Sequence, residues 1–268
     1  MKDKLLYSTL LKLRPLDGQP QPDPHSYRGL SMVLVLLGER HPAMAESLHR
    51  DTQDKPLTVS PLLRPKRGEE DWSLRLTMLE EEPFCALAES VLAWDPGRPL
   101  TLGNGQYSLK GLEATPGSDP RVACTNFRQL AESAQSGERR WRLDFLTPTS
   151  FRSKGGYSQF PAVALVFGSL ARRWSRFSPA PLPPGLTAAL SESITVAEYR
   201  IGLSRLGFGR YFEPGFTGWC AFSASKRADD ETCRWAGALA RFAFFSGVGA
   251  KTTMGMGQTR FHDGGGGS

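Results

Sequence analysis

Strand-like and helix-like segments follow one another in a similar order twice along this chain of 268 residues, and this repetition constrains its fold more than any other feature. Short apolar or alternating segments predict strands, and segments with an apolar stripe predict helices. In the first half we expect strands at 5–13, 58–63 and 72–79, helices at 29–37, 43–49 and 83–93, and a hairpin at 100–112. Further on we expect a short helix at 127–134, strands at 139–146, 195–206, 216–222 and 256–261, a loop at 147–156, and helices at 160–174 and 229–245. Each half therefore predicts an α+β sandwich with helices on one face of an antiparallel sheet, and the boundary falls near residue 138.

The composition favours a polyanionic partner. Lys and Arg number 33 against 27 Asp and Glu, a formal net charge of +6. Hydrophobic residues make up 40% of the chain, which is enough for a substantial core. No apolar run approaches the ~20 residues that a membrane span needs. The first residues lead into a strand-like stretch and not into a secretion signal, so we expect a cytoplasmic protein.

Cysteine and histidine spacing argues against a zinc site. The four cysteines lie far apart without a Cys-x-x-Cys pair, and there are only four histidines. We therefore expect reduced thiols in the core, no metal and no cofactor. Residues 264–268, Gly-Gly-Gly-Gly-Ser, are typical of an engineered flexible linker and carry no functional weight.

A glycine-rich segment at 247–257 follows the last predicted helix. Two Gly-x-Gly pairs surround Lys251, Thr252 and Thr253. Such a cluster indicates positive φ angles or a close approach of the backbone to another group. Exposed N–H groups beside Lys251 and Arg260 would suit a phosphate-bearing ligand. The alternative is a helix-to-strand turn that binds nothing.

Two nucleotide-binding motifs are excluded for this segment. A Walker loop needs Gly before its Lys and another Gly five residues earlier, but this chain has Ala250 and Phe245 there. That loop also follows a strand, whereas this segment follows a predicted helix. A dinucleotide fingerprint fails because Thr252 and Arg260 stand where its third glycine should be.

Several motifs in one order resemble the CRISPR-associated repeat-processing endoribonucleases, the Cas-six family of the repeat-associated RNA-binding protein superfamily. The glycine-rich segment resembles the loop of that family. Residues 145–152 resemble its Thr-Pro-Thr segment, and 215–219 resemble its Gly-Phe-x-Gly strand. Residues 42–49 followed by 55–60 resemble its Leu-His and Lys-x-Phe-Thr-x-Ser stretch. Each match is short, but their order across residues 1–262 is specific.

The resemblance implies an α+β fold of two tandem ferredoxin-like (RRM-like) domains. Residues 1–137 would carry the catalytic histidine, and 138–263 the RNA-binding loop. It implies a prokaryotic cytoplasmic enzyme that cuts CRISPR precursor RNA within each repeat, without metal, to give guide RNAs. The 2′-hydroxyl would attack the adjacent phosphate and leave a 2′,3′-cyclic phosphate. The product could stay bound among other Cas effector subunits. The alternative is a non-catalytic guide-RNA-binding subunit of a CRISPR effector or CRISPR-associated transposon complex.

Two residues occupy the catalytic positions of the family. His49 stands at its histidine position, and a positioned acid or base contributes roughly 10²–10⁴-fold to a rate. The expected helix end at His49 favours positive charge there, which suits a general acid. Lys55 stands at the lysine position and would stabilise the charged phosphorane. The alternatives are an exposed helix-ending histidine and a solvated loop lysine.

The helix before Pro42 lacks the tyrosine or histidine that some family members place there. Ser31 is the only polar side chain in its stretch 29–34, and Tyr27 and Arg28 lie just upstream, so these three are candidates for a supporting role. Among other histidines, His25 and His41 are weaker substitutes for the acid or base, and His262 is expected to be inert.

RNA binding is expected at the glycine-rich segment and at a basic groove. The segment would contribute the N–H groups of Gly247, Gly249, Gly255 and Gly257 with Lys251, Thr252 and Arg260. The groove would contain Arg139, Arg140, Arg142, Arg152 and Lys154, unless these charges form solvated faces. Arg172 and Arg173 are expected to end a helix favourably. Phe151 would either stack on a base or belong to the core.

Overall fold

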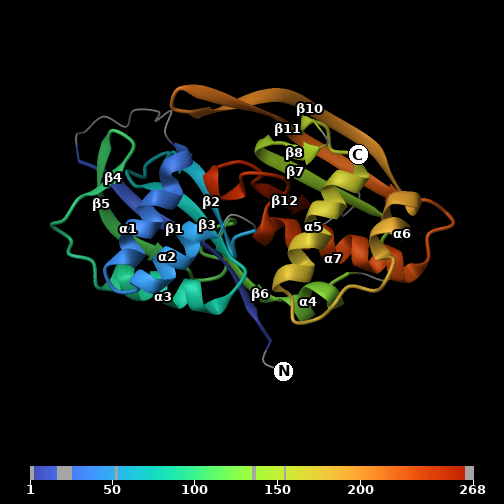
Figure 1. The fold of residues 1–268 in the computed structure, drawn as a ribbon, viewed down its shortest axis with the longest axis horizontal. Helices are drawn as coiled ribbons and strands as arrows, with labels where there is room; N and C mark the ends of the chain where they lie inside the picture. Colours follow the sequence, from blue (N-terminus) through green and yellow to red (C-terminus); the bar gives the residue numbers. More distant parts are fainter. Residues whose placement is uncertain (1–2, 17–25, 52–53, 135–136, 154, 263–268) are drawn as a thin grey trace.

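Two sheets with their helices lie side by side in the computed structural model (Figure 1). It describes residues 3–16, 26–51, 54–134, 137–153 and 155–262. His25, Lys154 and the tail 264–268 therefore lie outside the described residues. None of the described helices is long and apolar enough to cross a membrane.

The first sheet follows the order of a ferredoxin-like domain. It pairs its main strands antiparallel in the order β2-β3-β1-β5-β4, and β6 pairs with β1. The strands are β1 (Leu5–Pro15), β2 (Leu57–Leu63), β3 (Trp72–Met78), β4 (Leu100–Leu102), β5 (Gly105–Glu113) and β6 (Ala123–Asn126). The 3-10 turn η1 (Ser26–Arg28) precedes the helices α1 (Gly29–Gly38), α2 (Pro42–Arg50) and α3 (Glu81–Leu92). Leu11, Leu74 and Leu76 pack under these helices, because alternate residues of a strand face the same side.

The second sheet repeats this topology in the order β10-β11-β7-β12. Its strands are β7 (Arg140–Thr149), β10 (Ile194–Phe208), β11 (Tyr211–Ala224) and β12 (Thr259–His262), and the hairpin β8 (Phe151–Ser153) with β9 (Gly156–Ser158) stands apart. The helices are α4 (Phe127–Glu132), α5 (Val163–Phe177), α6 (Leu186–Ser193) and α7 (Asp230–Ser246), followed by η2 (Thr252–Met254) in the glycine-rich segment. Trp141, Phe167 and Trp174 are fully buried in its core. The prediction of two tandem ferredoxin-like domains is thus confirmed, while the boundary at residue 138 stays a prediction.

Several predicted elements need correction. The stretch expected to be a loop at 147–156 contains the end of β7 and the hairpin β8–β9. The strands expected at 195–206 and 216–222 are confirmed, although both are longer than expected and pair as one hairpin that turns at Gly209, where φ is 73°. Helix α6, which begins shortly after Pro184, was not predicted. Strands β8 and β9 have 3 residues each, too few for an alternating pattern to show, and α6 depends on its packing against α5 and α7.

The cysteines divide between core and surface. Cys220 and Cys233 are buried, as expected, but Cys85 and Cys124 are exposed, so the prediction of four core thiols is wrong for those two. Cys124 lies on β6, whose alternate residues face away from the core. All four thiols are unpaired.

Candidate active site

A cavity of about 680 Å³ lies where the two domains meet. This volume is within the range of ordinary ligand pockets. The connection between α2 and β2 supplies one wall, and helix α5 and the glycine-rich segment supply the others. The lining residues are Asp51, Asp54, Lys55, Phe151, Arg152, Ala164, Leu165, Gly168, Ser169, Arg172, Arg173 and 249–254. Five cationic and two acidic side chains are among them, so the cavity suits a polyanion.

Lys55 holds the end of helix α2. Its amine donates to the carbonyl oxygens of Leu48 and Asp51 and, at 3.4 Å, to that of His49. The last carbonyls of a helix have no partner within it, and a lysine that binds them stabilises the helix end. Burial lowers the pKa of Lys55 below its ordinary value, although the charge of Asp51 opposes the shift. Lys55 therefore places a cation at the cavity wall.

The backbone of His49 lies beside this lysine, but its side chain is not part of the described cavity lining. The backbone of His49 is brought to Lys55, whereas its imidazole is exposed and is not among the described residues that line the cavity. The other described histidines lie in different places. The His41 Nε2 atom is 3.1 Å from Glu89 on α3, and the His262 Nε2 atom is 2.5 Å from Asp144.

Two arginines of α5 form ion pairs with an aspartate of the other domain. Asp54 accepts from Arg172 at 2.7 Å and from Arg173 at 3.4 Å, and Arg173 also donates to the carbonyl of Lys55 at 3.0 Å. Helix α5 continues to Phe177, so the expectation that Arg172 and Arg173 end a helix is wrong. Side chains one turn before the end reach across to the neighbouring domain instead. These contacts fix the connection that carries Lys55.

Burial and the neighbouring charges shift the pKa values of Arg173 and Asp54. Arg173 is only 2% exposed, and its burial lowers its pKa to about 10. Burial alone would raise the pKa of Asp54. The hydrogen bond from Arg172 and the charges of Arg173, Arg172 and Arg176 outweigh that effect and hold the pKa below its ordinary value. Asp54 is consequently a carboxylate at neutral pH.

The glycine-rich segment uses its own N–H groups within the protein. Gly249 donates to the Ser169 hydroxyl at 3.3 Å, Gly255 to the carbonyl of Val59 at 3.1 Å, and Gly257 to the carbonyl of Pro148 at 3.1 Å. The prediction that these N–H groups are exposed for a ligand is therefore wrong. Gly247 likewise donates back to α7, at Ala243.

Close approach explains why residue 249 is glycine. Gly249 has φ 84°, and a Cβ atom there would lie 2.4 Å from the carbonyl oxygen of Ser150. Gly257 has φ 68°, and a Cβ atom would lie 2.2 Å from that of Val248. The glycines thus permit a tight fold of the segment. Thr252, at its centre, is buried, although it contributes to the cavity lining.

Lys251 joins the cavity to an aromatic cluster. It is the only described non-glycine residue with positive φ, 58°. Its amine pairs with Glu213 on β11 and lies 5.1 Å from the ring centre of Phe208 and 5.4 Å from that of Tyr157. Tyr27 stacks on Phe208 with ring centres 5.1 Å apart. Of the other predicted supporting residues, Arg28 donates to the Tyr27 hydroxyl at 3.1 Å, and Ser31 is exposed on α1.

The predicted basic groove separates into distinct places. Arg152 is exposed and lines the cavity. Arg142 and Arg260 both pair with Asp144 on the sheet face opposite the helices, at 3.1 and 2.9 Å. Arg139 instead donates to the carbonyls beside the start of α7, which is a structural role, while Arg140 pairs with Glu198. Phe151 is 3% exposed and belongs to the core, so the core alternative holds for it.

Known proteins with similar sequences and folds agree with these observations. The sequence pattern of the CRISPR-associated endoribonuclease Cas6 matches residues 143–259. The CRISPR-associated endoribonuclease Cas6 of Mycobacterium tuberculosis is 37% identical over 128 residues, which are 47% of this chain and 40% of that relative. This match therefore spans less than half the length of the curated relative.

Solved structures match along nearly the whole chain. A Cas6 product complex has a TM-score of 0.82 at 32% identity and covers 97% of this chain and 100% of that chain. A Thermus thermophilus Cas6 has a TM-score of 0.77 at 29% identity, covering 98% and 100%. Because the first of these proteins exceeds 30% identity across its full length, the protein belongs to the CRISPR-associated Cas6 family.

Proposed function

We propose that the protein is an endoribonuclease that cuts CRISPR precursor RNA within its repeats and releases guide RNAs. The observation that carries this proposal is the cationic cavity between the domains. Lys55 lies in its wall, and the Lys55 amine contacts the carbonyl of His49 at the end of α2. The product complex of a close structural relative supports it. We place the reaction in the prokaryotic cytoplasm, where precursor RNA is made.

The proposed reaction needs no metal. The 2′-oxygen forms a bond to the adjacent phosphorus while the bond from phosphorus to the 5′-oxygen breaks. A base removes the proton of the 2′-hydroxyl, and an acid gives a proton to the departing 5′-oxygen. Negative charge accumulates on the phosphorane oxygens, where a fixed cation stabilises the transition state. The products are a 2′,3′-cyclic phosphate and a 5′-hydroxyl.

Lys55 is suited to stabilise the phosphorane. An ammonium group has three donors, and two of those on Lys55 make short contacts to helix carbonyls. The third contact, to the carbonyl of His49, is long at 3.4 Å. That donor can turn to a phosphate oxygen while the other two keep the amine in place. The ammonium group of Lys55 would then bind the carbonyls at the end of α2 and a phosphate oxygen of the RNA at the same time.

His49 is the proposed general acid. It lies in the last turn of α2. Its side chain is exposed and its carbonyl lies next to Lys55 at the cavity wall, so we propose that RNA lying across the rim reaches it. Tyr27, Arg28 and Ser31 begin the neighbouring α1 region and are proposed to support the reacting ribose. Helix α1 packs against α2, the helix that carries His49, and this supports the assignment.

RNA phosphates are proposed to lie along α5 and the β8–β9 hairpin. Arg172 has an exposed side chain even while it pairs with Asp54, and Arg152 is exposed on β8. Lys251 would also bind a phosphate once its ion pair with Glu213 breaks. If these cations retain the product, the protein can assemble with other Cas subunits while it holds the guide RNA. Arg142 and Arg260 would then extend the contact over the sheet.

A non-catalytic guide-RNA-binding role is the second candidate. It is favoured by one observation: the His49 side chain is not among the described residues that line the cavity. In this role the cationic cavity would hold a guide RNA that another enzyme has cut.

Cleavage of repeat RNA in EDTA separates the two roles. We expect the wild type to cut the RNA and leave a 2′,3′-cyclic phosphate. An RNA with hydrogen in place of the 2′-hydroxyl upstream of the cut should bind and remain whole. Binding without cleavage of the natural RNA would establish the second role, and cleavage of the 2′-deoxy RNA would contradict the mechanism.

A further inference from the structure

Arg75 of β3 is a buried cation outside the cavity. It lies on the sheet face that meets the other domain and is 4% exposed. Its Nη2 atom donates to the carbonyl of Phe244 at 2.7 Å, and its Nη1 atom donates to the side chain of Gln258 at 2.8 Å. Phe244 lies just before the glycine-rich segment and Gln258 directly after it. One guanidinium group thus contacts both ends of that segment.

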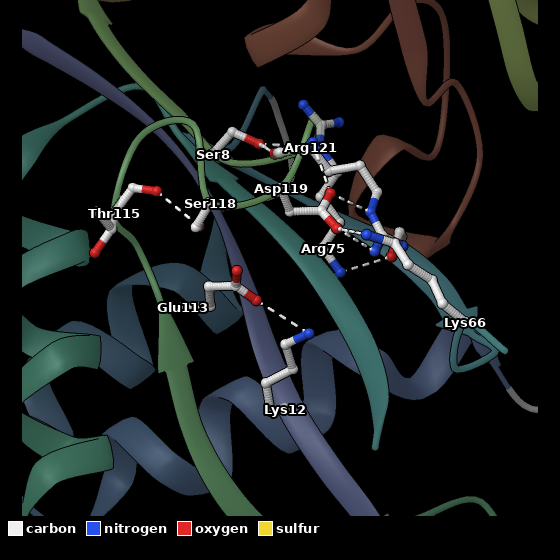
Figure 2. A network of polar contacts seen from close by, with 10 residues as sticks. Ser8, Lys12, Lys66, Arg75, Glu113, Thr115, Ser118, Asp119 and Arg121 are labelled. Atoms are coloured by element: carbon white, nitrogen blue, oxygen red, sulfur yellow. Dashed lines mark hydrogen bonds and ion pairs between the residues drawn. The ribbon is translucent and has the colours of Figure 1, made fainter. Parts of the chain in front are cut away.

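The charge of Arg75 is balanced by dipoles. Among the described residues, its hydrogen-bond acceptors are carbonyl, amide and hydroxyl oxygens, including the Ser8 hydroxyl at 2.9 Å. The Asp119 carboxylate pairs instead with Arg121 and Lys66, each at 2.7 Å, as the dashed lines in Figure 2 show. Burial and the charge of Arg121 lower the pKa of Arg75 to about 9. A buried cation without a carboxylate needs a specific geometry to be retained.

Helix α7 supplies that geometry. Phe244 lies in its last turn, where the carbonyls lack partners and the helix dipole is negative. The Phe244 ring also lies under the guanidinium, 4.1 Å from ring centre to Arg75 Cζ. Arg75 therefore acts as a helix cap that comes from the neighbouring domain.

A chain of neutral hydrogen bonds continues this contact. Gln258 donates to the Thr58 hydroxyl at 3.1 Å, and Thr58 meets Thr77 at 2.7 Å. Thr77 in turn donates to the carbonyl of Phe245. Strands β2 and β3 of the first sheet thus bind the entry and exit of the glycine-rich segment from one side.

We propose that Arg75 is a positioning residue, which fixes the spacing between the two ends of residues 247–257. The cavity wall at 249–254 is then already formed before RNA binds. A preformed wall avoids the entropy loss of ordering a loop during binding. The consequence for RNA rests on the proposed function, whereas the effect on the free protein does not.

Substitution of Arg75 by lysine tests the two-ended contact. Lysine keeps a positive charge, but it lacks the planar fork that reaches two acceptors in fixed directions. Leu87→Ala is the control. Leu87 on α3 is fully buried in the core of the first domain, whereas Arg75 faces the second domain. The two variants are compared under conditions where their global stabilities are equal.

Amide hydrogen exchange of the free protein is the first measurement. We expect the amides of 247–258 to exchange at least about tenfold faster in Arg75→Lys than in Leu87→Ala. Gln258→Met releases one end only and should give a smaller increase in the same amides, and it serves alone if Arg75→Lys does not fold. Equal exchange in these variants and the control would overturn the proposal.

RNA binding and single-turnover cleavage are the second measurement. We expect Arg75→Lys to weaken repeat-RNA affinity about tenfold and to keep the rate at saturating RNA within about twofold, because bound RNA orders the segment. A lower saturating rate with unchanged affinity would overturn this consequence. If the wild type itself ignores repeat RNA, the proposed function fails, and hydrogen exchange still decides the role of Arg75.

Discussion

The two domains share one topology but use the open face of the sheet differently. In the first domain this face bears Thr58, Arg75 and Thr77, which are buried against the second domain. In the second domain the corresponding face bears Arg142 and Arg260, which remain half-exposed. One repeated fold therefore supplies both an internal joint and an external basic surface. We therefore expect substitutions of the proposed catalytic residues of the first domain to affect cleavage, and substitutions of exposed arginines of the second domain to affect binding.

The largest expected effect comes from the proposed acid. His49→Ala should lower the single-turnover cleavage rate by roughly 10²–10⁴-fold, because a positioned proton donor is lost. RNA affinity should change little, since the imidazole is exposed and lies outside the described lining. The rate is measured at saturating RNA. His41→Ala is the matched control, and a loss as large in that variant would refute the assignment to His49.

The next effect comes from the second domain. Arg172→Ala should weaken RNA affinity about tenfold and reduce the slope of log affinity against log salt by about one, as expected for one phosphate contact. The saturating cleavage rate should stay near that of the wild type, because Arg173 still holds Asp54 and the carbonyl of Lys55. Arg234→Ala on α7 is the control, because the two arginines are 58% and 57% exposed. Equal salt slopes for both variants would exclude a phosphate contact at Arg172.

The pH dependence of cleavage sharpens the role of Lys55. Its folded pKa is lowered, so the cation is present below that value and is lost as pH rises through it. Activity should therefore begin to fall below the ordinary lysine pKa of about 10.4. In Lys55→Arg the remaining activity should persist to higher pH, because a guanidinium keeps its proton. Rates are measured against an enzyme-free RNA control, and an unchanged alkaline limb would show that another group titrates.

The smallest expected effect concerns the ion pairs of Asp54 with Arg172 and Arg173 between the domains. The pKa of Asp54 is lowered in the folded protein, so its carboxylate stabilises the fold above the ordinary value of about 3.9. This contribution is lost as pH falls through the lower folded value. Asp54→Asn should cost about 1 kcal/mol at neutral pH, with a smaller difference in acid. Glu198→Gln, from an exposed pair with Arg140, is the control in urea unfolding. A difference for Asp54→Asn that does not narrow in acid would contradict this account.

Local sequence patterns predicted most elements, whereas the contacts between domains depend on residues far apart. Pro42 at the start of α2 and the turn at Gly103 are local signals, and the structure confirms both. The Arg172–Asp54 pair joins residues 118 positions apart, and no local periodicity indicates it. The motif that placed Lys55 also said nothing of its hold on the end of α2. The resemblance to a known family thus predicted the cation Lys55, but the sequence did not predict the residues with which the charges near the cavity pair.

Affinity and saturating cleavage rate, measured together on one repeat RNA for the wild type, His49→Ala and Arg172→Ala, test the central claim most directly. The account predicts that His49→Ala keeps its affinity and loses its rate, and that Arg172→Ala does the reverse. Equal loss of both quantities in the two variants would contradict the division of catalysis and binding between the domains.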